Sequence, residues 1–169
     1  MNMLIKYFIT IKKQLNILQY SILKYGLISS TYLYFFGFTI IYVEYLYVAL
    51  FLFLFDMLPA IYLHIQYLNN DRGVLLEFNK ETSEISIIKD TNIETFHLDE
   101  IQSVTIVYSY GYKGSLGWYS FGIYHFCEFN FKSGSSIIFT CLMINDIEDF
   151  LKYSIRKEIK NKFKLIAKI

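Results

Sequence analysis

The sequence predicts a membrane α-helical hairpin followed by an α+β domain, in which six or seven antiparallel strands form a barrel or sandwich closed by a C-terminal helix. Three observations predict this fold. Residues 25–65 include two acids and no base, the apolar residues after position 70 alternate with polar ones, and helical spacing returns near the C-terminus. With 169 residues, of which 54% are hydrophobic and 18% charged, the chain has room for one domain plus a further element, and it is not intrinsically disordered.

The net charge of +1 conceals a strong segregation of charge along the chain. Residues 1–24 hold four lysines and no acid, residues 67–155 hold twelve acids and six bases, and residues 156–169 hold six bases and one acid. A basic head, an apolar middle, an acidic body and a basic tail are typical of a cytoplasmic domain anchored in a membrane. This pattern predicts the lipid bilayer as a partner, and the net charge of +1 argues against nucleic acid.

Residues 1–22 are predicted to form an amphipathic helix on the cytoplasmic interface, or one that continues into the first span. Apolar residues recur there at alternating spacings of four and three, which gives one apolar stripe. These residues are Leu4, Phe8, Ile11, Leu15, Leu18 and Ile22. The alternative is a helix packed on the surface of a partner protein.

Residues 23–66 are predicted to form the transmembrane hairpin. As a single helix, the 41 residues from Tyr25 to Ile65 would run about 60 Å, twice the hydrocarbon thickness of about 30 Å, so the segment must fold back. Glu44 divides it into two stretches that are each long enough to span. Because lysines flank the hairpin and none lies near Glu44, we expect a multi-pass protein with both termini in the cytoplasm.

Asp56 is the main candidate for an intramembrane polar site, together with Pro59 and His64. An acid near the centre of a span costs about 2.5–3.5 kcal/mol. The twelve Leu, Ile, Phe or Val residues between Leu46 and Ile65 return about 4–7 kcal/mol, so insertion is still favoured. Asp56 could couple to protons or bind a polar group of a partner. The structural alternative is a hydrogen bond to a tyrosine of the first span or to a hydroxyl within residues 29–31, which would lock the hairpin.

The segment after Asn70 is predicted to consist of short strands and one helix. The expected strands are residues 73–79, 84–89, 93–98, 104–110, 119–131 and 136–141, with turns at residues 80–83 and 132–134. A three-residue loop with Gly134 in the left-handed position would place Cys127 opposite Phe139 and leave Cys127 too far from Cys141 for a disulfide. A basic amphipathic helix beginning near Asn145 is expected to end the domain of residues 70–169.

A glycine-spaced loop between two of these strands carries the candidate partner-binding residues. Lys113, Trp118 and Tyr119 are a composition typical of protein contacts. The alternative is an aromatic plug at the open end of the barrel.

The sequence offers little to support catalysis. No histidine, cysteine or carboxylate cluster has the spacing of a metal site, and no nucleophile elbow, phosphate loop or dinucleotide fingerprint is present. We therefore expect no catalytic residues, no cofactor and no metal.

The chain resembles small bacterial membrane proteins in which a helical hairpin precedes a pleckstrin-homology-like domain. The residues that carry the resemblance are 58–59 and 64–67 at the end of the second span, 98–101 before the middle strand, and 129–134 leading to 138–142. The resemblance implies a pleckstrin-homology-like fold and an inner-membrane location. It would also place inositol phosphates near the first turn, but there Lys80 lies beside Glu81 and Glu84, which argues against phosphoinositide binding.

These observations together predict a non-enzymatic, membrane-anchored binding or scaffold module with an unidentified protein partner. One alternative is an immunity or defence protein that neutralises a toxin at the membrane. The other is a small transport or channel subunit that uses Asp56.

Overall fold

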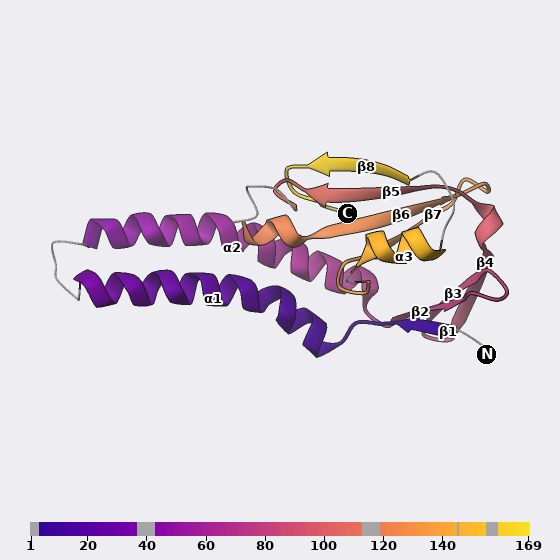
Figure 1. The fold of residues 1–169 in the computed structure, drawn as a ribbon, viewed down its shortest axis with the longest axis horizontal. Helices are drawn as coiled ribbons and strands as arrows, with labels where there is room; N and C mark the ends of the chain where they lie inside the picture. The colour runs from indigo at the N-terminus through magenta and orange to yellow at the C-terminus, as the bar shows by residue number, and fades with distance from the viewer. Residues whose placement is uncertain (1–3, 37–42, 113–118, 145, 155–158) are drawn as a thin grey trace.

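In a computed structural model, the protein forms two four-stranded sheets that pack face to face, with a long helical hairpin projecting from one end (Figure 1). The structure describes residues 4–36, 43–112, 119–144, 146–154 and 159–169. The first sheet has the order β1-β2-β3-β4 and the second β7-β6-β5-β8. The strands are β1 (Leu4–Tyr7), β2 (Val74–Asn79), β3 (Glu84–Lys89), β4 (Asn92–His97), β5 (Ile101–Ser109), β6 (His125–Phe131), β7 (Ser136–Thr140) and β8 (Ile159–Lys164).

The helical hairpin, α1 (Ile11–Phe36) and α2 (Val43–Asp71), is inserted between β1 and β2. β1 pairs antiparallel with β2, so the chain enters and leaves the hairpin at neighbouring strands. The prediction of one helix over residues 1–22 was therefore wrong at its start: residues 4–7 form a strand, and the helix begins at Ile11 and runs unbroken through residue 36. The strand forms because Lys6 pairs with Glu77 at 2.6 Å and the ring of Tyr7 packs against Phe150, contacts that local periodicity does not reveal.

The main core lies between the two sheets and beneath α3 (Ile147–Ser154). Phe150 of this helix packs edge-on against Phe78 of β2, and Phe96 of β4 stacks on Phe131 of β6. The large, fully buried side chains of the core include Leu76, Phe78, Ile85, Ile101, Ile106, Phe129, Phe139 and Met143. Aromatic residues from both sheets thus fill the space that the strand alternation predicted to be apolar.

A second core lies on the opposite face of the β7-β6-β5-β8 sheet, where the C-terminal half of α2 covers it. Ala60, Leu63 and Tyr67 of α2 are buried there against side chains such as Val107 and Phe126. β5 is consequently buried on both faces. The second helix extends beyond the predicted end at residue 66 as far as Asp71, and half of it belongs to the domain rather than to a free-standing hairpin.

Within the described residues, one helical segment, Leu50–Asp71, is long and apolar enough to cross a membrane. A third of its most apolar window is buried inside the protein, because the half of α2 nearest the domain packs on the sheet. The N-terminal half of α2 points away from the domain (Figure 1).

The C-terminal basic segment forms a strand, not the predicted continuation of the helix. After the short helix α3, β8 pairs parallel with β5, and Phe163 stacks on Tyr108 at 5.3 Å between ring centres. Apolar or neutral residues at positions 159, 161 and 163 alternate with lysines at 160, 162 and 164. This period of two is the strand signal, and exposed lysines are typical of edge strands.

The strands expected from residue 73 onward are otherwise close to those observed. β6 and β7 pair with Phe129 opposite Ile137 and Cys127 opposite Phe139, and Gly134 has φ +87° in the turn, all as predicted. Cys127 and Cys141 are free, buried core residues. The expected strand at 119–131 begins later than predicted, because a 3₁₀ turn, η3 (Ser120–Ile123), precedes β6.

Substituting Leu63→Ala is expected to destabilise the protein by about 2–5 kcal/mol, because the fully buried side chain would leave a cavity between α2 and the sheet. Leu58→Ala is the matched control, since Leu58 lies on the same helix and is 58% exposed. Thermal unfolding in detergent would show a large fall in Tm for the first variant and a small one for the second. Equal falls would contradict the assignment of α2 to the domain core.

Candidate functional site

The carboxylate of Asp56 joins three elements at the point where the hairpin leaves the domain. Asp56 is 3% exposed. Its carboxylate accepts hydrogen bonds from the Lys24 ammonium at 2.9 Å, the Tyr25 hydroxyl, the Ser120 backbone N–H at 2.6 Å and the Ser120 hydroxyl at 2.8 Å. Lys24 and Tyr25 belong to α1, Asp56 to α2, and Ser120 to η3. We call these four residues the Asp56 junction.

The Asp56 junction satisfies a buried charge with one opposite charge and three further donors. Charge-assisted hydrogen bonds are stronger than neutral ones, and removing one partner from a buried ion pair costs about 3–5 kcal/mol because the other charge is left uncompensated. The junction therefore fixes the angle at which the hairpin meets the sheet domain.

The sequence indicated part of this arrangement. A tyrosine of the first span was among the expected partners of Asp56, and Tyr25 is that tyrosine, whereas the other expected partners, the hydroxyls at 29–31, are exposed. Lys24 and Ser120 were missed. Lys24 is the last base before the apolar segment and Asp56 lies in the middle of the second helix, so their opposite charges were a signal for pairing. Ser120 is 64 residues from Asp56, and nothing local indicates that contact.

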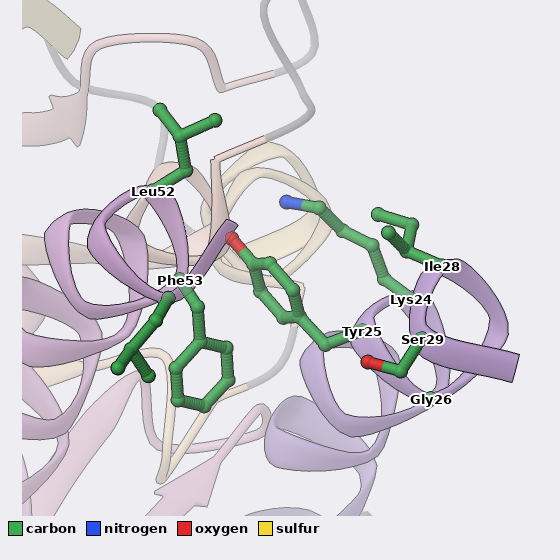
Figure 2. A pocket seen from close by; sticks show the side chains of 8 residues that line it. Lys24, Tyr25, Gly26, Ile28, Ser29, Leu52 and Phe53 are labelled. Carbon is green, nitrogen blue, oxygen red and sulfur yellow. The ribbon is translucent and has the colours of Figure 1, made fainter. Parts of the chain in front are cut away.

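An apolar cleft of about 660 Å³ opens between α1 and α2 next to the Asp56 junction (Figure 2). Tyr25 extends from α1 toward α2 and meets Phe53 edge-on, with ring centres 4.7 Å apart. The cleft is lined by Lys24, Tyr25, Gly26, Ile28, Ser29, Leu50, Leu52 and Phe53. Its volume and its mostly apolar lining with few polar groups are those of a ligand-sized pocket.

The remaining predicted site residues do not gather at the cleft. Pro59 lies inside α2, which continues past it, and the Nδ1 atom of buried His64 lies 3.1 Å from the Tyr124 hydroxyl, which holds α2 against the domain. Tyr119 stacks on Phe121 at 5.1 Å beside η3. Lys113 and Trp118 lie outside the described residues.

A second buried carboxylate, Asp71, ends α2 and contacts β7. It accepts hydrogen bonds from the Thr140 hydroxyl and from the Asn70 side-chain amide at 2.7 Å, and Asn70 also donates to the Ile138 carbonyl at 3.2 Å. Burial raises the pKa of Asp71 to about 6, and the hydrogen bonds from Thr140 and Asn70 oppose that rise. Unlike Asp56, Asp71 is held by neutral donors in these contacts.

A family model described as a PH domain matches residues 6–152. The chain therefore belongs to the PH domain family. The matched range starts in β1 and ends in α3, so the helical hairpin lies inside the domain rather than before it. No curated protein matches the chain. Membership in this family supports a binding or scaffold module.

Substituting Asp56→Ala is expected to lower stability by about 3–5 kcal/mol, because the ammonium of Lys24, whose side chain is 15% exposed, loses its counter-charge. The double variant Lys24→Met, Asp56→Leu is expected to recover part of that loss, since it removes the uncompensated ammonium but still leaves the Ser120 backbone N–H without its acceptor. Thermal unfolding in detergent measures both, with the exposed Asp99→Asn as control. A double variant no more stable than Asp56→Ala would contradict a coupled pair.

The pKa of Asp71 predicts how stability depends on pH. The folded state holds the proton up to about pH 6, whereas the unfolded state releases it near 3.8, so this group's contribution to stability falls as pH rises from about 4 to about 6. Unfolding free energies of the wild type and Asp71→Asn, measured between pH 4 and pH 7, should differ by a pH-dependent amount that levels off above about 6. A constant difference would contradict the raised pKa.

Proposed function

We propose that this protein is a non-enzymatic binding or scaffold module whose PH domain is anchored in a membrane by its internal helical hairpin. The observation that carries the proposal is the exposed apolar surface of the hairpin on the side of Asp56 away from the sheets. Both helices contribute to it. The exposed large side chains are Leu27, Ile28, Tyr34, Phe35, Tyr47, Val48, Leu50, Phe51, Leu52, Leu54 and Phe55. Continuous apolar surface of this kind marks a membrane or partner contact.

The length of α2 supports insertion of its N-terminal half. Residues 43–55 alone extend about 20 Å at 1.5 Å per residue, which is less than the hydrocarbon thickness of about 30 Å. The exposed apolar face of α2 continues past Asp56, however, through Leu58, Ile61, Tyr62 and Ile65. Residues 43–55 therefore insert into the hydrocarbon, while the face from Leu58 to Ile65, which lies on the part of the helix that packs on the domain, lies along the interface.

The contacts of the Asp56 junction favour a structural role for Asp56, in which it holds the hairpin to the domain, over a role in ion transport. The carboxylate is already engaged by an ammonium, two hydroxyls and a backbone N–H, and it lies where the hairpin meets the domain. We propose that the junction transmits the orientation of the inserted hairpin to the PH domain, which remains on the cytoplasmic side with the lysines at the hairpin base.

The buried thiols support the non-enzymatic part of the proposal. Burial raises the pKa of Cys141 to about 12 and that of Cys127 further still. Because the thiolate is the nucleophile, neither side chain is prepared for covalent catalysis. The same burial makes the wild type a suitable background for cysteine labelling.

Anchoring is tested by cysteine labelling in sealed membrane vesicles. Phe51→Cys places a thiol on the hairpin, and Ser133→Cys places one in the exposed β6–β7 turn. A water-soluble maleimide should label Ser133→Cys only when the cytoplasmic face is accessible, and should leave Phe51→Cys unlabelled in both vesicle orientations. Carbonate washing should leave the protein in the membrane fraction. Release by carbonate, or rapid labelling at position 51, would overturn the proposal.

A further inference from the structure

β8 carries three lysines on one face of the second sheet. Lys160, Lys162 and Lys164 pair in register with Thr105, Val107 and Ser109 of β5. Val107 packs in the core beneath α2, so the three lysines point to the α2 side of the sheet. The Lys164 ammonium confirms this direction, because it lies 5.9 Å from the ring centre of Phe126, another residue of that core.

The basic segment continues from β8 to the exposed apolar face of α2, which Lys168 reaches. Leu58, Ile61, Tyr62 and Ile65 follow the spacing of one helix face and are between 43% and 58% exposed. The Lys168 ammonium, beyond β8, lies 5.8 Å from the ring centre of Tyr62. β8 runs along the edge of its sheet, and its C-terminal end points in the direction in which the hairpin projects (Figure 1). An apolar helix face flanked by lysines is the arrangement of an interfacial membrane-binding surface.

Glu128 of β6 shares the face of these lysines, since it pairs with Thr105 in register, but most exposed acidic side chains lie elsewhere. The first sheet and its turns expose Glu81, Asp90, Glu94, Asp99 and Glu100. An anionic surface would attract the β8 side of the molecule and repel the first sheet, so the charge distribution selects one orientation of the domain.

We propose that Lys160, Lys162, Lys164 and Lys168, which we call the β8 basic strip, bind anionic lipid headgroups and hold the PH domain against the bilayer beside the inserted hairpin. This inference rests on the proposed anchoring. Exposed lysines also protect an edge strand from pairing with another chain. Edge protection does not account for Lys168, which follows the strand and lies over a side chain of α2.

The strip acts through general electrostatic attraction, with no requirement for one headgroup stereochemistry. Each lysine near an anionic surface contributes roughly fivefold to association, so removing three should weaken headgroup association about a hundredfold at low salt. The attraction falls within a Debye length of about 8 Å at physiological ionic strength, and added salt should therefore release the strip.

The test uses the full chain in nanodiscs of neutral phosphatidylcholine, with and without phosphatidylglycerol. A spin label at Leu165→Cys, an exposed position between Lys164 and Lys168, reports proximity to a nickel-chelating lipid at the headgroup level. A second label at Phe51→Cys reports hairpin insertion through contact with oxygen in the hydrocarbon. The test variant is Lys160→Glu, Lys162→Glu, Lys164→Glu. The matched control, Lys80→Glu, Lys89→Glu, Lys132→Glu, makes the same charge change at exposed lysines in or beside the turns of the two sheets.

The expected result is strong relaxation at position 165 in phosphatidylglycerol nanodiscs, reduced by high salt and by the test variant but not by the control variant. Equal relaxation in neutral and anionic nanodiscs, or an equal loss in both variants, would overturn the inference. A label at position 165 that stays in water in both kinds of nanodisc would also overturn the inference. The strip would then bind an acidic protein, a nucleic acid or nothing. Because the label at position 51 reads insertion separately, failure of the anchoring proposal is distinguishable from failure of this one.

Discussion

A carboxylate buried away from water needs hydrogen-bond donors from the protein. In this protein the donors to the buried Asp56 carboxylate come from both the hairpin and the domain, and so they join the two. Asp56 of α2 faces α1 and η3, and it takes its four hydrogen bonds from them. If the hairpin rotated or slid relative to the domain, Asp56 and Lys24 would each lose a partner in a buried setting, where an unpaired charge is most costly. The ion pair therefore fixes the position of the hairpin relative to the domain, whereas apolar packing alone would allow the helices to slide.

The insertion of the hairpin between β1 and β2 strengthens that junction. A hairpin placed before the domain would be attached by one segment, whereas this one is attached at both ends to neighbouring strands, at Tyr7 and Val74. In addition, the second half of α2 is the cover of the second core. Hydrogen bonds from Tyr67 to the Ala167 carbonyl and between His64 and Tyr124 align this half of the helix with the sheet. Force or displacement at the hairpin would thus reach the core of the PH domain directly.

The two buried acids of α2 illustrate two ways of placing a carboxylate in a core. Asp56 has an ammonium within 3 Å. Asp71 has a hydroxyl and an amide, and burial raises its pKa to about 6. The first is a fixed ion pair at the end of the domain that faces the hairpin. The second lies at the opposite end of the packed segment, where burial moves its titration to about pH 6.

The sequence by itself determined the features that depend on neighbours along the chain. Apolar runs defined the two long helices, alternation defined β2 to β7 to within a few residues, and the turn at Gly134 set the register that pairs Cys127 with Phe139. Tertiary structure decided what depends on distant partners. Residues 4–7 form a strand because they pair with β2, and residues 159–164 form a strand because they pair with the edge of β5 that β6 leaves open. Asp56 accepts hydrogen bonds from a serine 64 residues away. Short segments have too little local preference to resist such pairing, and a buried charge takes whichever donors the fold brings within reach.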